Sequence, residues 1–351
     1  MERSYHNIHI SSSQNMGYVL DGSVDLVVTS PPYPIIEMWD DSFEMQIPDV
    51  GKLLKSSPLE AFELMHRELD KVWAECFRVL RPGGIMCINI GDATRTVNGI
   101  FQLFNNHSRV VTTCVGLGFV CLPCVIWRKK TNAPNKFMGS GMLPSGAYVT
   151  LEHEWILVFR KGDKRCFQSD LEKKNRRRSA FFWEERNKWF SDVWDVKGVK
   201  QDMENCTCRQ RNASFPLEIP YRLVNMFSVF GDTVLDPFLG LGTTVVACMM
   251  TGRNSVGVEI SSELLPNIKD NVIDFGVDKM NGLIRKRYED HLNFVCEREK
   301  AGKVVKHFNR NLKCKVVTSQ ETDIELFYLK GISVVGRGDL GFDCVYGGLK
   351  C

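Results

Sequence analysis

The chain has 351 residues, of which 44% are hydrophobic and 25% are charged, and its formal net charge at pH 7 is +3. This composition excludes a disordered chain and is enough to bury one large core or two modest ones. The small net charge does not by itself indicate a polyanionic partner. Residues 160–188, however, contain 11 lysines or arginines against 5 acidic residues, so positive charge is concentrated in one segment.

The cysteines and the apolar runs indicate the cellular compartment. The 13 cysteines are an odd number without regular spacing, which predicts free thiols in a reducing cytoplasm. The close pairs, Cys121/Cys124 and Cys206/Cys208, lack a second half at zinc-site spacing, so we expect no metal site. No apolar run approaches about 18 residues and the N-terminus lacks the segments of a signal peptide, so we expect a cytoplasmic protein without membrane contact.

The hydrophobic pattern predicts strands that alternate with helices along most of the chain. Strands are expected at residues 6–10, 24–29, 85–90, 119–127, 155–159, 233–236 and 255–259. Helices are expected at residues 59–80, 100–117, 217–230 and 245–250. This alternation predicts an α/β fold with a mostly parallel sheet and helices on both faces, in which ligands bind beyond the carboxyl ends of the strands.

The strand at residues 24–29 leads into the turn Ser30-Pro31-Pro32-Tyr33. The two prolines hold φ at about −65° and remove two N–H donors, so the carbonyls of Ser30 and Pro31 point in fixed directions. Such acceptors can receive the hydrogens of an exocyclic amine, and the Tyr33 ring can stack on a flat base. We therefore expect this turn to carry the chemistry.

A second unit lies far downstream, where the strand at residues 233–236 runs into the loop 236–244. Its glycines, Gly240 and Gly242, permit positive φ and let the backbone approach a ligand. Glu259 ends the following strand, 259 − 240 = 19 residues beyond the first loop glycine, where a carboxylate can accept both hydroxyls of a ribose. Strand, loop, helix, strand and terminal acid in this order predict a site for a nucleoside cofactor.

Together, the turn 30–33 and the loop 236–244 resemble the motifs of the amino-methylating DNA methyltransferases. The catalytic motif precedes the cofactor loop, as in their β class, and the likeness continues through residues 81–84, 152–162 and 212–216. The resemblance implies a Rossmann-like, AdoMet-dependent methyltransferase fold, S-adenosyl-L-methionine as cofactor and double-stranded DNA as substrate. It also implies that the target base is flipped out of the duplex and methylated by direct in-line transfer.

The first residue of the turn bears on the target base. Family members that act on the N4 amine of cytosine typically carry Ser-Pro-Pro-Tyr, whereas those that act on the N6 amine of adenine more often have Asp or Asn in place of the serine. Ser30 therefore favours a site-specific cytosine-N4 methyltransferase. The resemblance also implies a restriction–modification system with a cognate endonuclease as partner, and an enzyme that acts as a monomer or homodimer. Adenine-N6 methylation and a catalytically silent DNA-binding regulator are the alternatives.

The resemblance also implies roles for individual residues around the cofactor. Cofactor contacts are implied for Asp236, Pro237, Phe238, Gly240, Gly242, Thr243, Glu259, Phe215 and Ser12. Asp236 is expected to orient the loop or the methionine amine, and Glu259 to hold the ribose. Ser12 stands where the family usually has an acid, so it should hold the adenine less firmly. Thr243 and the neighbouring Thr244 have a second interpretation as helix-capping hydroxyls, and Glu154, at a strand start, is expected to be structural.

Residues 163–210 break the alternation because they are polar, basic and aromatic at once. We interpret them as a target-recognition insert in which five basic residues contact DNA, namely Lys173, Lys174, Arg176, Arg177 and Arg178. The alternative is a solvated helix followed by aromatic side chains that pack on the core. The expected organisation is a catalytic half (1–162), this insert (163–210), a cofactor-binding half (211–277) and a C-terminal extension of unknown role (278–351) with a loosely ordered, glycine-rich end.

Overall fold

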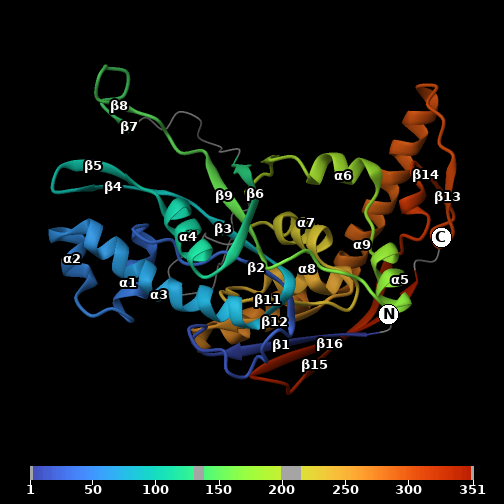
Figure 1. Ribbon diagram of the computed structural model, residues 1–351, viewed down its shortest axis with the longest axis horizontal. Helices are drawn as coiled ribbons and strands as arrows, with labels where there is room; N and C mark the ends of the chain where they lie inside the picture. The colour runs from blue at the N-terminus through green and yellow to red at the C-terminus, as the bar shows by residue number, and fades with distance from the viewer. Residues whose placement is uncertain (1–2, 130–137, 199–214, 349–351) are drawn as a thin grey trace.

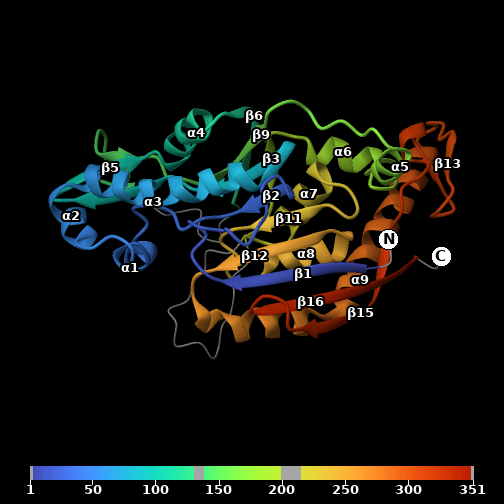
Figure 2. The ribbon, with the colours of Figure 1, turned by 60° about the horizontal axis from the view of Figure 1, so that its bottom comes forward.

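The computed structural model describes residues 3–129, 138–198 and 215–348. Within these residues the core is a ten-stranded sheet with the order β10-β6-β9-β3-β2-β11-β12-β1-β16-β15. The five central strands, from β3 to β1, are parallel to one another. Helices lie on both faces of this sheet (Figure 1, Figure 2), so the predicted α/β fold is confirmed.

Each of the seven predicted strands is present in the sheet, which also contains three strands that were not predicted, β10, β15 and β16. The sheet contains β1 (Arg3–Ile10), β2 (Val24–Thr29), β3 (Leu80–Ile90), β6 (Phe119–Arg128), β9 (His153–Lys161), β10 (Val193–Asp195), β11 (Thr233–Asp236), β12 (Asn254–Glu259), β15 (Phe327–Val335) and β16 (Leu340–Gly348). Three small hairpins stand apart from it, formed by β4 (Ala93–Val97) with β5 (Ile100–Phe104), β7 (Met138–Gly139) with β8 (Ala147–Tyr148), and β13 (His307–Asn309) with β14 (Cys314–Val316).

The α-helices follow the same alternation in the central part of the chain. They are α1 (Asp40–Glu44), α2 (Val50–Ser56), α3 (Pro58–Val79), α4 (Asn106–Gly116), α5 (Asp170–Arg178), α6 (Trp183–Trp189), α7 (Glu218–Phe227), α8 (Thr243–Thr251) and α9 (Leu265–Lys300). Short 3-10 helices occupy Glu37–Trp39, Ser262–Leu264 and Ser319–Glu321. Among the described residues, no helix combines the length and apolarity needed to cross a bilayer.

The central strands are buried on both faces, which explains their continuous apolar sequences. In β2, Val27 points into a core that it shares with residues of α3 and α4, whereas Leu26 and Val28 point into a core shared with residues of α7 and α8. Successive side chains of a strand point to opposite faces, so a strand covered on both sides needs apolar residues at every position. This pattern is why residues 24–29 are recognisable as a strand.

The helix predicted at residues 100–117 is wrong in its first part. Residues 100–104 form β5, which pairs with β4, and the helix α4 begins only at Asn106. The hairpin is turned by Asn98 and Gly99, which have φ values of 51° and 78°. Asn-Gly is a strong signal for a two-residue hairpin turn because both positions need positive φ.

The glycine-rich end of the chain is ordered through residue 348, against expectation. β16 pairs with β1 in antiparallel register, and Phe342, Cys344 and Tyr346 on β16 are buried. The Tyr346 hydroxyl donates to the carbonyl of Met249 at 2.7 Å. The C-terminal extension therefore packs against the sheet and enlarges it. Its predicted start lies beside Gly276, whose non-helical backbone (φ 66°, ψ 162°) divides α9 into two segments.

The cysteines in the described ranges are free thiols, as predicted. The strand expected around Cys121 and Cys124 is present as β6, but Cys121 is exposed and Cys124 is half-buried. β10 pairs with residues 126–128 of β6, so among the described residues the first half of β6 pairs with β9 on one side and with no strand on the other. Residues 120–124 of β6 are therefore exposed or half-buried, although Phe119 at the start of the strand is buried.

Candidate active site

The two predicted motifs lie side by side on neighbouring strands. β2 and β11 are parallel, with Leu26 opposite Val234 and Val27 opposite Leu235. Thr29 and Asp236 end these strands, and the Thr29 hydroxyl donates to Asp236 Oδ1 at 2.7 Å. The turn 30–33 and the loop that follows Asp236 thus leave the sheet from one edge. We call this the carboxyl edge, because the parallel strands β2, β11, β12 and β1 end there.

Asp236 holds the beginning of the cofactor loop in place. Its side chain is 3% exposed. It accepts hydrogen bonds from the Thr29 hydroxyl, from the Phe238 amide at 3.1 Å and from the Thr244 hydroxyl at 2.6 Å. Burial raises the pKa of Asp236 to about 6, although these hydrogen bonds act in the opposite direction. Gly242 is the N-cap of α8 and no side chain caps that helix, so Thr244 binds Asp236 instead of capping.

Glu259 lies beneath the glycine loop. One of its carboxylate oxygens accepts the Gly240 amide and the other accepts the Ser261 amide, each at 2.9 Å. Gly240 and Gly242 have φ values of 55° and 81°, in the left-handed region that L side chains rarely adopt. The carboxylate therefore fixes the loop from below, at the strand end where a ribose-binding acid was predicted. Ribose binding itself stays a prediction.

The remaining residues predicted to bind cofactor lie around the same loop or below it. Phe238 is half-buried, with its ring edge-on to Trp73 at 6.0 Å. Ser12 follows β1, in which Ile10 lies opposite Glu259 of β12. The exposed hydroxyl of Ser12 accepts a hydrogen bond from the backbone amide of Gln14 at 3.3 Å. Pro237 is buried in the loop, and Thr243 is the first residue of α8.

Phe215 is placed differently from the other predicted cofactor residues. It is buried in the core cluster that also contains Val28 and Val234, beneath the carboxyl edge. Its ring is therefore part of the core between the sheet and the helices α7 and α8. A contact between Phe215 and the cofactor stays a prediction.

The catalytic turn is tied to two residues that the sequence did not single out as functional. The Tyr33 hydroxyl lies 3.0 Å from Ser30 Oγ and donates to Glu154 Oε2 at 2.9 Å. Asn89 Nδ2 donates to the Tyr33 hydroxyl at 2.8 Å and to Glu154 Oε2 at 2.7 Å. Lys129 donates to the other oxygen of Glu154. A polar cluster therefore lies directly behind Ser30, with Asn89 from β3 and Glu154 from β9.

Burial determines the protonation of Tyr33. Its side chain is 8% exposed and belongs to the core cluster under α3 and α4. Burial and the nearby Glu154 carboxylate raise the pKa of Tyr33 well above its ordinary value, so the phenol is neutral and keeps its hydrogen. Ile35, two residues on, has φ 68° although it is β-branched, which is a strained conformation held by its complete burial. Stacking of the Tyr33 ring on a base stays a prediction.

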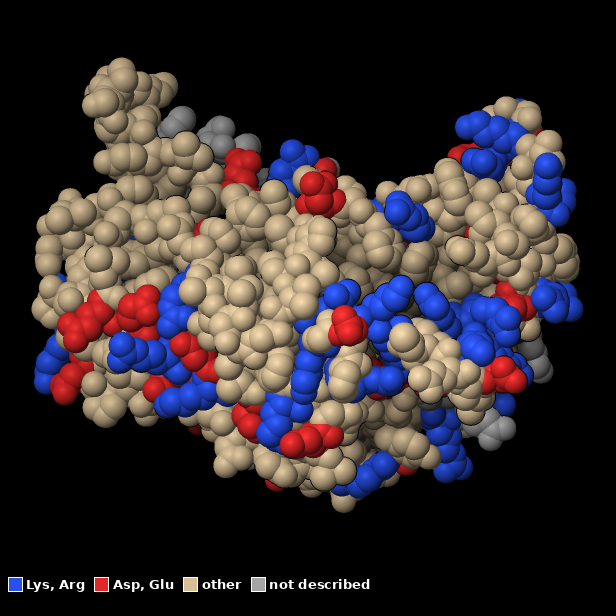
Figure 3. Space-filling view, viewed as in Figure 1, with Lys and Arg blue, Asp and Glu red and all other residues tan. Residues whose placement is uncertain are grey.

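The predicted DNA-binding run lies at the other edge of the sheet. Lys173, Lys174, Arg176, Arg177 and Arg178 are on α5, and Ser179, directly after them, accepts the Phe230 amide at 2.8 Å, just before β11 begins. Figure 3 shows lysine and arginine side chains gathered over α5 and the C-terminal extension. We call this side the amino edge.

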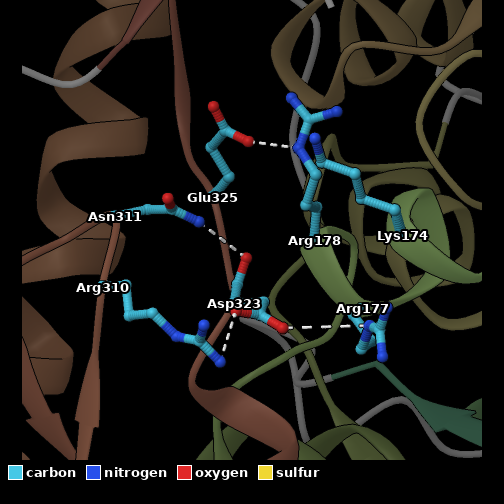
Figure 4. A pocket seen from close by; sticks show the side chains of 7 residues that line it. All are labelled: Lys174, Arg177, Arg178, Arg310, Asn311, Asp323 and Glu325. Atoms are coloured by element: carbon cyan, nitrogen blue, oxygen red, sulfur yellow. Dashed lines mark hydrogen bonds and ion pairs between the residues drawn. The ribbon is translucent and has the colours of Figure 1, made fainter. Parts of the chain in front are cut away.

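The side chains of this run contact the C-terminal extension. They line a pocket of about 530 Å³ formed by Lys174, Arg177, Arg178, Arg310, Asn311, Asp323 and Glu325 (Figure 4). Arg178 pairs with Glu325, and Arg177 lies 3.8 Å from Asp323. The run therefore lies at the edge of the sheet opposite to the turn at residues 30–33. Contact with DNA away from the target base stays a prediction.

The aromatic residues of the insert pack on the core, as the alternative interpretation held. Phe182 is completely buried and stacks on His291 with ring centres 3.8 Å apart. Trp189 and Trp194 are buried as well. The insert also adds β10 to the edge of the sheet.

Comparison with known proteins decides the family. The DNA methylase family model (N6_N4_Mtase) matches residues 24–270, a range that contains both the Ser30–Tyr33 turn and the Asp236 loop. The chain belongs to this DNA methylase family. The methylase is 46% identical over 346 residues to the Type II methyltransferase M.MthZI of Methanothermobacter thermautotrophicus, with 97% of this chain and 95% of the relative covered. It is 47% identical over 296 residues to the Type II methyltransferase M.MjaI of Methanocaldococcus jannaschii, with 79% and 96% covered.

Solved structures agree with this family. TTHA0409 of Thermus thermophilus, solved in complex with S-adenosyl-L-methionine, matches the methylase with a TM-score of 0.60 at 33% identity, covering 77% of this chain and 97% of that one. The PvuII DNA methyltransferase matches with a TM-score of 0.51 at 17% identity, which shows the fold alone. The predicted family of amino-methylating DNA methyltransferases and the predicted AdoMet-dependent methyltransferase fold are thus confirmed.

Proposed function

We propose that this methylase transfers a methyl group from S-adenosyl-L-methionine to the N4 amine of cytosine in a specific double-stranded DNA site. The observation that carries the proposal is the position of the Ser30–Tyr33 turn beside the Asp236 loop, on neighbouring parallel strands joined by the bond from Thr29 to Asp236. S-adenosyl-L-methionine is the methyl donor. Ser30, rather than an acid or amide, heads the turn, and this favours cytosine over adenine.

The chemistry of an aryl amine explains why such a turn is needed. The lone pair of the amine is delocalised into the ring, so the nitrogen has to become pyramidal before it can attack the methyl group. Acceptors at Ser30 Oγ and at the Pro31 carbonyl hold its hydrogens and favour that geometry. The N–C bond would form as the C–S bond of the sulfonium breaks, the electron pair of that bond would stay on sulfur, and the methylated nitrogen would lose one proton to solvent water.

Positioning supplies much of the expected rate. Well-oriented reactants save roughly 7–11 kcal/mol of the barrier. Flipping the base out of the duplex costs a few kcal/mol, which stacking on Tyr33 and contacts to phosphates would offset. On the donor side, Glu259 would hold the ribose, while Gly240 and Gly242 let the backbone approach the cofactor.

Nucleoside analysis tests the target base. Purified protein is incubated with S-adenosyl-L-methionine and unmodified genomic DNA, and the DNA is then digested to nucleosides. We expect N4-methylcytosine as the product. N6-methyladenine alone would contradict the cytosine assignment and favour the adenine alternative, and no methylated nucleoside at all would favour a DNA-binding protein without turnover.

A place in a restriction–modification system is the second part of the proposal. It is supported by the two relatives named as Type II methyltransferases, one of which is similar over nearly the whole chain. A cognate endonuclease should cut unmodified DNA at one short sequence and fail to cut DNA that this methylase has modified. If the endonuclease cut both the unmodified and the modified DNA at that sequence, the proposed partnership of the methylase with that endonuclease would be contradicted.

A further inference from the structure

Glu154 fixes the direction of the hydrogen bonds behind Ser30. An ionised carboxylate can only accept hydrogen bonds, so Tyr33 has to donate its single hydrogen to Glu154 Oε2, 2.9 Å away. The bond between Tyr33 and Ser30, at 3.0 Å, must then run the other way, with the Ser30 hydroxyl as donor. One lone pair of Ser30 Oγ faces Asn89 Nδ2, which donates to it at 3.4 Å, and the other is left for a donor that approaches from outside.

Two further side chains hold Glu154 in this role. Lys129 donates to Oε1, and Asn89 Nδ2 donates to Oε2 at 2.7 Å. Rotating the Asn89 amide by half a turn would put its oxygen against the carboxylate, so Glu154 also sets the orientation of Asn89. In this orientation Asn89 Oδ1 is buried without a hydrogen-bond partner. A buried acceptor without a partner costs about 1–3 kcal/mol and in a native protein asks for a functional reason.

The backbone leaves room for this arrangement at one glycine. A Cβ atom on Gly91 would lie 3.1 Å from Cε2 of Tyr33 and 3.3 Å from Cγ of Glu154. Both contacts are tighter than ordinary van der Waals distances, so any side chain at this position would press the two residues apart. Glycine at position 91 therefore allows the Tyr33 hydroxyl and the Glu154 carboxylate to meet.

We propose that Glu154 is a positioning residue for methyl transfer. Through Tyr33, it makes Ser30 Oγ present a lone pair, and not a hydrogen, to the target amine. This inference rests on the proposed function in that it assumes an amine as target, and it holds for cytosine and adenine alike. If the chain of bonds ran in the reverse direction, the Ser30 hydrogen would face the amine hydrogens and repel them.

Glu154→Gln is the decisive substitution because the side chain keeps its shape. Lys129 needs an acceptor, so it holds the glutamine oxygen at the Oε1 position and places the glutamine amide where Oε2 was. That amide then donates to Tyr33, and Tyr33 donates to Ser30. We expect a single-turnover methylation rate about a hundredfold below wild type, while the affinity for S-adenosyl-L-methionine and the circular dichroism spectrum stay unchanged.

A second substitution distinguishes an effect of hydrogen-bond direction from a purely structural role of Glu154. In Lys129→Met/Glu154→Gln the glutamine is free to turn its oxygen toward Tyr33, so we expect at least a tenfold recovery of rate over Glu154→Gln alone. A purely structural role for Glu154 predicts the opposite, since the double variant keeps fewer of the native hydrogen bonds. A double variant as slow as, or slower than, Glu154→Gln would therefore overturn the inference.

A double-mutant cycle with Ser30 gives an independent test. Once Ser30→Ala has removed the acceptor, Glu154→Gln should lower the remaining rate by less than about threefold, because both act through one chain of bonds. A hundredfold effect in both backgrounds would contradict the inference and leave the proposed function intact. A wild-type protein that methylates no DNA would instead remove the proposed function, and the inference with it.

Discussion

The two edges of the sheet use polar side chains in different ways. At the carboxyl edge, Thr29, Asp236 and Asn89 are buried. Thr29 and Asp236 position the loop that follows β11, whereas Asn89 keeps its Oδ1 atom without a hydrogen-bond partner. At the amino edge, charges are joined to one another across long stretches of chain. Arg165 donates to Asp232 with its two terminal guanidinium nitrogens, and Arg178 pairs with Glu325.

This difference teaches that the density of charge in a sequence is a poor guide to the site of chemistry. The most basic segment of the chain lies where strands begin, and its arginines contact carboxylates of the C-terminal extension. The turn at residues 30–33, in contrast, contains no charged residue, and the Glu154 carboxylate behind it pairs with Lys129. Each of the following predictions tests whether the two edges differ in this way.

The largest effect is expected for Ser30→Ala at the carboxyl edge. Removing one group that holds charge or hydrogens in a transition state typically lowers kcat by about 10²–10³-fold. We expect that loss in methylation, with the affinity for S-adenosyl-L-methionine unchanged. Ser23→Ala is the matched control, because Ser23 precedes the same strand at the amino edge and its hydroxyl only donates to the Leu20 carbonyl. Equal activity of the two variants would contradict the assignment of the catalytic turn.

The second effect concerns Asp236 and pH. Its pKa is about 6 in the folded chain against an ordinary value of 3.8. The stabilisation from the protonated form is therefore complete below pH 3.8 and is lost as the pH rises through 6. At about 1.4 kcal/mol per pH unit the loss approaches 3 kcal/mol. Urea unfolding between pH 3.8 and pH values above 6 should show that the free energy of unfolding of the wild type falls by about 3 kcal/mol relative to that of Asp236→Asn.

A constant difference between wild type and Asp236→Asn across this pH range would contradict the burial of a charged Asp236. Asp163→Asn is the control for the loss of one carboxylate, because Asp163 is exposed between β9 and α5. Its unfolding curves show how much of the change comes from net charge alone.

A smaller effect is expected for Glu259→Gln. The glutamine can accept only one of the amides of Gly240 and Ser261, so the loop loses one charge-assisted hydrogen bond as well as the acceptor for the ribose. Such bonds contribute about 1.5–3 kcal/mol, which corresponds to roughly a tenfold to hundredfold weaker affinity for S-adenosyl-L-methionine by calorimetry. Glu263→Gln, an exposed acid in the next turn, serves as control. An unchanged affinity would remove Glu259 from the cofactor site.

The smallest effect is expected at the amino edge, from replacing Arg176, Arg177 and Arg178 together with alanine. DNA affinity should fall by less than tenfold, and its dependence on salt should flatten by about one unit of slope for each phosphate that is no longer bound. The methylation rate at saturating DNA should not change. A triple alanine variant of Lys52, Lys55 and Lys71 removes the same charge elsewhere. Equal salt slopes for the two triple variants would remove the run from the DNA interface.

The sequence predicts those parts of the site that depend on neighbours in the chain. Residues 24–33 and 233–244 show a buried strand, a turn and a glycine loop in local order, and each pattern has one simple structural interpretation. The contact of Glu154 with Asn89 is different, because it joins residues 65 apart in the chain through the antiparallel pairing of β3 with β9. That pairing is not encoded in either strand by itself.

The same limit applies to the basic run, whose partners on the C-terminal extension no local pattern predicts. Whether an arginine is exposed to a ligand or paired depends on what lies opposite it, and Glu325 is 147 residues away from Arg178. The sequence of the C-terminal extension (278–351) indicates no role, although its strand β16 pairs with β1 and extends the sheet. Long-range ion pairs and edge strands therefore account for most of what the sequence alone did not predict.

The pairing of β16 with β1 has a consequence for how the polypeptide can be rearranged. Arg3 lies opposite Val345, so the first and last described strands are neighbours (Figure 2). A short linker could join residues 348 and 3, and the chain could be opened instead at the exposed residues 162–164. In such a circular permutant the glycine loop would be synthesised before the proline turn. The arrangement of the turn 30–33 beside the Asp236 loop should be unchanged, because it depends on which strands are adjacent and not on the order in which a ribosome makes them.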